Sequence, residues 1–115
     1  INMGQKLHVA KKYEIEYSSS FGFNNKVVEF HNLLTALGIS YNGESWDDDV
    51  EVNREDFRHG LEKLKNYDKL DEEKRTKIDE ALSEFDEPVE KIIEIMERLL
   101  IVSDQENEYM LLAFF

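Results

Sequence analysis

The chain has 115 residues, of which 41% are hydrophobic and 11% aromatic, so it can bury the core of one domain spanning residues 1–115 and lacks the composition of a disordered segment. Lys and Arg number 14 against 26 Asp and Glu, which gives a formal net charge of −12. This balance disfavours binding to nucleic acid or to an anionic membrane surface, because both need a positively charged footprint.

Cysteine is absent from the chain, which excludes a disulfide framework, a thiolate zinc site and a cysteine nucleophile. No window of about 18 uncharged apolar residues occurs, and the first residues lack the apolar core of a signal peptide. The sequence therefore predicts a cytoplasmic protein without a membrane span.

The negative charge is unevenly distributed along the chain. Residues 39–56 contain one Arg and seven acidic residues, so these eighteen residues carry half of the net charge. Residues 1–38, in contrast, contain four Lys and three Glu. Any function that depends on negative charge is therefore expected to involve residues 39–56.

Residues 7–17 alternate between apolar and polar side chains. A period of two with β-branched and aromatic members is typical of a half-buried strand, and Lys11 is the one misfit on its apolar side. Residues 18–22 interrupt the alternation with serines and Gly22, which predicts a loop.

A first amphipathic helix is expected after this loop. Apolar side chains recur at spacings of three and four, as they do on the buried face of a helix. They are Phe23, Val27, Phe30, Leu33, Leu34 and Leu37. Asn24 or Asn25 is predicted to cap the start of the helix, and Gly38 to end it in the left-handed conformation.

Residues 39–43 are predicted to form a turn, and a short second strand follows. Trp46, Asp48, Val50 and Val52 share one parity, whereas Asp47, Asp49 and Glu51 share the opposite one. We expect this strand at an edge of the sheet, because clustered carboxylates deter pairing with other chains.

Three further helices are expected between residues 53 and 103. The second starts at Asn53, the third has its acidic first turn at Asp71, and Pro88 takes the first helical position of the fourth. The third has the thinnest apolar stripe, which makes it the most solvated. The expected inward side chains are Phe57, Leu61, Leu64 and Tyr67, then Ile78, Leu82 and Phe85, and finally Val89, Ile92, Ile93, Met96, Leu99 and Leu100.

Residues 109–115 contain no charge, which predicts a strand at the centre of the sheet with both faces covered. The order strand, helix, strand, three helices, strand indicates a two-layer α+β fold. Its small sheet of about three strands, mixed or antiparallel, should have helices packed on one face. A three-stranded sheet cannot easily cover both faces of its central strand, so a homodimer through the open face is an alternative.

The sequence offers few candidates for catalysis. It has no nucleotide-binding loop, nucleophile elbow or zinc-protease motif, and its acidic residues lack the spacing of an EF-hand loop, so we predict no catalytic residues, cofactor or metal site. Each histidine has a structural explanation: His8 lies on the polar side of a strand, His31 at the margin of a helix's apolar face, and His59 one turn after Glu55.

The segment around Trp46 is the strongest candidate for a binding surface. Trp is common at the centre of protein interfaces, and strongly acidic proteins associate quickly with basic partners. Burial of Trp46 beneath the sheet remains the simpler structural explanation. The candidate interaction residues are Tyr41, Glu44, Trp46, Asp47, Asp48, Asp49 and Glu51.

Three possible functions remain open on the sequence alone. The first is a non-catalytic interaction or regulatory module that docks a basic partner protein through residues 44–56. The alternative is a small enzyme that uses a histidine with a carboxylate, of which His59 with Glu55 is the first choice, or a homo-oligomeric structural protein.

Overall fold

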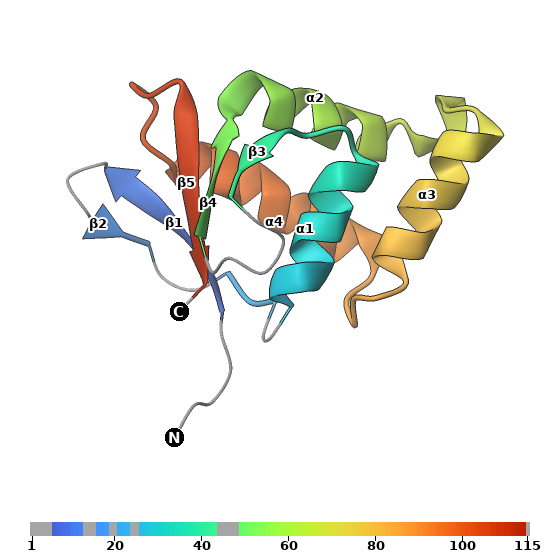
Figure 1. Ribbon diagram of the computed structural model, residues 1–115, viewed down its shortest axis with the longest axis horizontal. Helices are drawn as coiled ribbons and strands as arrows, with labels where there is room; N and C mark the ends of the chain where they lie inside the picture. Colours follow the sequence, from blue (N-terminus) through green and yellow to red (C-terminus); the bar gives the residue numbers. More distant parts are fainter. Residues whose placement is uncertain (1–5, 13–15, 19–20, 24–25, 44–48, 115) are drawn as a thin grey trace.

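The computed structural model describes residues 6–12, 16–18, 21–23, 26–43 and 49–114. The strands of these residues lie together at one end of the molecule and the helices extend away from them (Figure 1). In chain order the elements are β1 (Leu7–Lys12), β2 (Glu16–Tyr17), α1 (Val27–Ala36), β3 (Tyr41–Asn42), β4 (Asp49–Asn53), α2 (Arg54–Lys65), the 3-10 helix η1 (Tyr67–Lys69), α3 (Glu72–Leu82), α4 (Val89–Val102) and β5 (Tyr109–Phe114).

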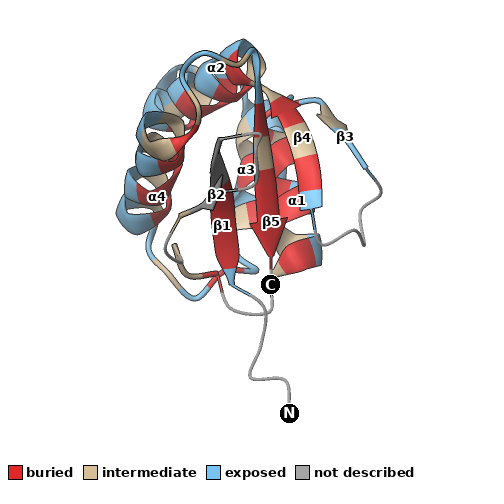
Figure 2. Ribbon diagram, turned by 90° about the vertical axis from the view of Figure 1, so that its left-hand side faces the viewer, coloured by how far each residue is buried: buried red, intermediate tan, exposed pale blue. Residues whose placement is uncertain are grey.

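All strand pairings are antiparallel, and the described helices lie on one side of the sheet, so the predicted two-layer α+β architecture is confirmed (Figure 2). In the described part of the chain the sheet has five strands in the order β2-β1-β5-β4-β3, more than the expected three. The strands β1, β5, β4 and β3 form the main ladder. The short strand β2 pairs with β1, and the register of this pair is irregular between Ala10 and Lys12.

The central position of the last strand is confirmed. On one side residues 112–114 of β5 pair with residues 7–9 of β1, and on the other side β5 pairs with all of β4. Met110, Leu112 and Phe114 point toward the helices and are at most 3% exposed. On the opposite face Ala113 is buried, whereas Tyr109 is 38% exposed. The second face is therefore covered at one end of the strand and open at the other.

The prediction of one strand over residues 7–17 is wrong. The stretch forms β1 and β2, which pair with each other and bring Ala10 opposite Tyr17. Alternation of apolar and polar residues continues with the same period through a hairpin as through one long strand. No Gly, Pro or Asn stands between the two strands, so the sequence contains no signal that separates them.

The expected edge position of the second strand is also wrong. Strand β4 begins at Asp49, and the predicted strand residues Trp46–Asp48 lie outside the described part of the chain. Strand β4 is an interior strand, because β5 pairs with one side of it and β3 with the other. Tyr41 and Asn42 of β3, which were expected in a turn, pair with Val52 and Glu51 and form the edge.

The helices that were expected to cover the sheet do so. In α1 the ring of Phe30 lies 5.8 Å from that of Phe114, edge to face, which joins this helix to the central strand. Helix α4 packs beside α2 and contacts β1. Helix α3 packs against α1 and lies farthest from the sheet, with Ile78 and Ala81 as its buried residues (Figure 1). It is the peripheral element that its thin apolar stripe predicts.

Side-chain caps at two helix starts follow the sequence. The side chain of Asn53 accepts a hydrogen bond from the backbone N–H of Asp56 at 3.1 Å, and that of Asp71 accepts one from Lys74 at 2.9 Å. Each bond satisfies an amide that the first turn of a helix leaves without a partner. Pro88 occupies the N-cap of α4, one residue before its predicted position.

Helix α1 starts and ends in different ways. Asn24 and Asn25, the predicted caps, lie outside the described residues, and Lys26 is the N-cap without a side-chain cap bond. At the other end Gly38 has a φ of 74°, as predicted. The N–H of Ile39 bonds to the carbonyl of Leu34 at 2.9 Å, which completes a Schellman motif and directs the chain toward β3.

A buried arginine joins α2 to the connection between α4 and β5. Arg54 is 8% exposed. Its guanidinium group donates hydrogen bonds to the carbonyl of Asn107 at 3.0 Å, to the hydroxyl of Ser103 at 2.6 Å, and to the carbonyls of Leu100 and Asp104. Because these acceptors lie just before β5, Arg54 fixes the path by which the chain enters the central strand.

Candidate functional site

The structure describes three of the seven predicted interaction residues. Tyr41 lies in the edge strand β3, and Asp49 and Glu51 lie in β4. The other four lie outside the described residues, and they are Glu44, Trp46, Asp47 and Asp48. The site is therefore built from Asp49 and Glu51 and from their neighbours in the sheet.

Tyr41 does not share a sheet face with Asp49 and Glu51. In the register it is opposite Val52, whose side chain is buried among the helices, and directly opposed residues of an antiparallel pair point to the same side. Its ring meets that of His31 in α1 edge to face, with the centroids 5.0 Å apart. Tyr41 therefore holds the edge strand against the helical layer.

Asp49 and Glu51 belong to the side of the sheet that faces away from the helices, which we call the open face. Figure 2 looks onto this face and shows the described helices behind or beside the sheet. The registers place Ala113 beside Asp49, Leu111 beside Glu51 and Tyr109 beside Asn53. The open-face residues of the described strands include His8, Asn42, Asp49, Glu51, Asn53, Tyr109, Leu111 and Ala113.

The open face carries negative charge on a rigid support. Asp49 is exposed and Glu51 half-buried; β5 pairs with both residues, and β3 pairs with Glu51 on the other side of β4. Alternate residues of a strand are about 7 Å apart, so the two carboxylates form a short row. At the described open-face positions of β3, β4 and β5, no Lys or Arg offsets them.

A small polar hollow of about 190 Å³ lies at the β3 edge of this face. Its lining residues are Ser40, Tyr41, Asn42, Glu51, Asn53, Asp56 and Tyr109. The carboxylates of Glu51 and Asp56 are hydrogen-bond acceptors, so the hollow is suited to donor groups. No cluster of three metal-ligating side chains occurs in the described residues.

The histidines occupy three separate environments. The Nδ1 atom of His8, on the open face, donates to the carbonyl of Lys6 at 2.9 Å. His59 is exposed on α2. Glu55, its candidate partner, pairs instead with Arg58, and the interactions found among described residues include none for His59. The geometry therefore adds nothing to the hypothesis of a catalytic pair.

His31 is buried, which corrects its expected position at the margin of an apolar face. It is 1% exposed, and its Nδ1 atom donates to the carbonyl of Val27 at 2.6 Å. Its Nε2 atom has no hydrogen-bond partner. Sequence spacing places residue 31 beside Phe30, and the edge strand that covers its ring becomes visible only in the structure.

We expect His31→Phe to leave the free energy of unfolding unchanged or to raise it by up to about 1 kcal/mol, because it removes a buried acceptor that has no donor. The carbonyl of Val27 keeps its helical bond from the backbone N–H four residues later. Urea denaturation measures this change, with His31→Ala as the control, for which the cavity should cost about 2 kcal/mol. A loss for His31→Phe as large as that for His31→Ala would contradict the interpretation that the ring stabilises the fold by filling space and that its unpaired Nε2 atom is a cost.

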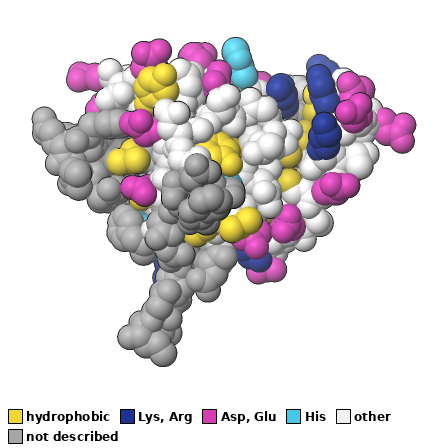
Figure 3. Space-filling model, viewed as in Figure 1, with side chains coloured by type: hydrophobic (Ala, Val, Ile, Leu, Met, Phe, Trp, Pro, Cys, Tyr) yellow, Lys and Arg dark blue, Asp and Glu magenta, His cyan; other side chains and the backbone are white. Residues whose placement is uncertain are grey.

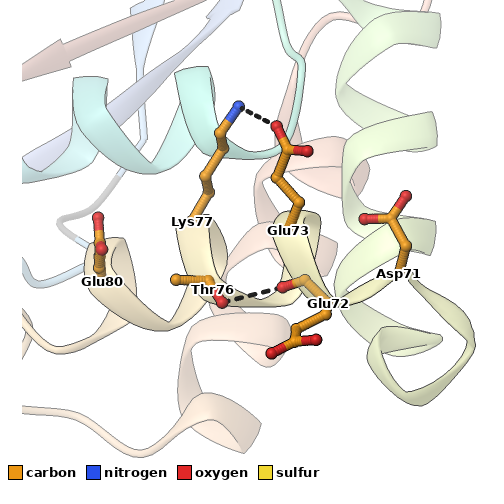
Figure 4. A pocket seen from close by; sticks show the side chains of 6 residues that line it. All are labelled: Asp71, Glu72, Glu73, Thr76, Lys77 and Glu80. Atoms are coloured by element: carbon orange, nitrogen blue, oxygen red, sulfur yellow. Dashed lines mark hydrogen bonds and ion pairs between the residues drawn. The ribbon is translucent and has the colours of Figure 1, made fainter.

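A larger depression, of about 760 Å³, follows the exposed side of α3. Figure 4 shows its six lining side chains spread along this helix and its cap. Lys77 pairs with Glu73 at 3.5 Å, and the hydroxyl of Thr76 donates to the carbonyl of Glu72 at 2.9 Å. Because all of these residues belong to one solvated helix surface, the depression has no opposing wall and is a weaker candidate than the open face.

The clearest perturbations of titratable groups lie away from the open face. A hydrogen bond from Lys65 to Glu97, whose charged atoms are 2.6 Å apart, raises the pKa of Lys65. A hydrogen bond from the phenol of Tyr67 to Asp79, at 2.6 Å, raises the pKa of Tyr67. These pairs connect α2 to α4 and η1 to α3, so they stabilise the helical layer. The space-filling view likewise shows Lys and Arg side chains gathered toward the α3 end of the molecule (Figure 3).

Comparison with known proteins identifies no relative: no family model, curated protein or solved structure matches this chain. Among the described helices, none has the length and apolar character needed to cross a membrane.

Proposed function

We propose that this protein is a non-catalytic interaction module, which docks a basic partner protein through the acidic segment of residues 44–56. The observation that carries the proposal is the row of Asp49 and Glu51 carboxylates, held on an interior strand and directed away from the helices. A fixed row of like charges attracts an oppositely charged partner from a distance and orients it during the encounter.

The charge distribution supports the same proposal. Half of the net charge of −12 lies in residues 39–56, so the field is strongest near β4. Two basic side chains of α2, in contrast, have acidic partners, namely Glu55 beside Arg58 and Glu97 beside Lys65. We also place the protein in the cytoplasm, because its lack of cysteine suits a reducing compartment.

The test compares association rates at low and high salt. Binding proteins are captured from the native host with the wild-type chain, and a purified basic partner is then mixed with wild type and with the double variant Asp49→Asn, Glu51→Gln in a stopped-flow instrument. We expect the double variant to associate about tenfold more slowly at low salt, with a weaker dependence on ionic strength.

The matched control is the double variant Glu80→Gln, Glu84→Gln, which removes the same charge from exposed positions of α3 and the turn after it. It should associate at nearly the wild-type rate, because its charges lie far from the open face. If both double variants associated equally slowly, the effect would come from the net charge of the protein, and a binding site on β4 would be refuted. Captured partners with no basic surface would also refute the proposal.

A further inference from the structure

The acidic row of β4 lies beside an apolar strip on β5. Leu111, which is half-buried, lies beside Glu51, and Tyr109, which is 38% exposed, lies beside Asn53. Neighbouring strands are about 4.8 Å apart, so the carboxylates and the apolar side chains form two parallel lines at about that separation. Charge attraction alone would not require the apolar side chains of β5, so they indicate a further property of the partner.

We infer that the docking segment of the partner is an amphipathic helix with a basic stripe next to an apolar stripe, and that it packs along β4 and β5 on the open face. This inference rests on the proposed function and specifies the partner's chemistry. The apolar stripe covers Tyr109 and Leu111, and the Lys or Arg side chains of the neighbouring stripe reach Asp49 and Glu51.

A helix fits this surface in both spacing and architecture. Side chains three and four residues apart lie about 5–6 Å from each other along one helix face, which is comparable with the roughly 7 Å between alternate residues of a strand, so a helix laid along β4 and β5 can contact successive positions of each line. The described helices cover the opposite side of the sheet, so a partner helix would add a third layer, as in sheets that carry helices on both faces.

Charge selects a basic partner over a second copy of this chain. Two open faces stacked on each other would bring their own Asp49 and Glu51 rows together, in a protein with a net charge of −12. Like charges across an interface are unfavourable, and the described open-face positions of β3, β4 and β5 supply no Lys or Arg to offset them. A helix with basic side chains removes this repulsion.

The probe is a synthetic helical peptide of about 16 residues, long enough to populate a helix, with a leucine stripe, an adjacent lysine stripe and alanine elsewhere. Its dissociation constant is measured by fluorescence anisotropy, and its site by amide chemical shifts of the labelled full chain. We expect shifts centred on β4 and β5. Replacing the lysines of the peptide by glutamate, or its leucines by serine, should abolish binding.

The deciding variant is Tyr109→Thr, which keeps a strand-forming residue and removes the ring. It should weaken peptide binding about tenfold, the usual cost of losing an aromatic anchor. The control is Ile101→Thr, which removes a 73% exposed apolar side chain from α4 and should leave binding unchanged. Circular dichroism melting curves check that both variants fold, and Tyr109→Phe, which keeps the ring, should bind as wild type does.

Three outcomes would contradict the inference. If Asp49→Asn with Glu51→Gln weakens binding but Tyr109→Thr does not, the charged site stands and the apolar strip has no role. If the peptide does not bind or shifts amides elsewhere, the partner is not such a helix, and the proposed function is then decided by the association rates of the native partner. If sedimentation shows a wild-type dimer that Tyr109→Thr dissociates, a second copy occupies the face.

Discussion

Replacing Arg54 by methionine is expected to lower the free energy of unfolding by about 3 kcal/mol, the usual loss when one partner of a buried charged network is removed. Methionine retains most of the apolar stem but none of the donors. The carbonyls of Leu100, Asp104 and Asn107 then lose the guanidinium group that bridges them, and the hydroxyl of Ser103 keeps only the hydrogen bond that it donates to Leu100. Urea denaturation followed by circular dichroism gives the change in free energy.

Arg58→Met is the matched control, because Arg58 lies on the same helix with a side chain that is 44% exposed and paired with Glu55. Exposed ion pairs contribute little, so this variant should change the free energy of unfolding by less than about 0.5 kcal/mol. If the two variants lost equal stability, the effect would come from general loss of positive charge, and the interpretation of Arg54 as a clamp would be wrong.

The central strand could be predicted because its signal is local. An uncharged run of residues 109–115 in a chain with 35% charged residues has few alternatives to burial, and β5 is indeed paired on both sides. The helices have equally local signals, since apolar stripes and caps such as Asn53 depend on residues within a few positions of each other. These features require no knowledge of distant contacts.

The strands β2 and β3 could not be predicted for the opposite reason. Each has two residues, too few to show a period, and each is defined by the strand beside it. Arg54 is a related case, because a charged residue at a helix start is normally solvated. Its burial depends on Ser103 and Asn107, which lie far along the chain and show no sequence signal for this contact.

The candidate site, like the fold, could be predicted only where its signal is local. Alternation in residues 49–53 places Asp49 and Glu51 on one face, and the sequence is sufficient for that step. Tyr41 is close to them in the chain, but the antiparallel register places it opposite Val52, so Tyr41 points to the other side. Tyr109 and Leu111 were assigned to the interior, and only the register shows that they lie beside the acidic row.

Phe30→Ala is expected to cause the largest loss of stability, about 3–5 kcal/mol, which is the usual cost of removing a buried aromatic ring. Phe30 is fully buried, and its ring lies 5.8 Å from the rings of Phe23 and Phe114. The substitution therefore leaves a cavity where α1 meets the central strand. The substitution also removes a packing partner of Phe23. The backbone of Phe23 has a φ of 57°, which is unfavourable for a side chain of this size, and packing of its ring, including contact with Phe85, maintains this conformation.

Phe30→Leu separates the loss of the ring from the loss of burial. Leucine refills most of the cavity, so this variant should lose only about 1–2 kcal/mol and keep the cooperative urea transition of the wild type. Phe30→Ala should in addition bind the dye that reports exposed apolar surface, because α1 then no longer packs firmly on β5. An alanine variant as stable as the leucine variant would mean that α1 can collapse onto the sheet without this ring. The open face would then rest on a helical layer that does not depend on Phe30 for its position.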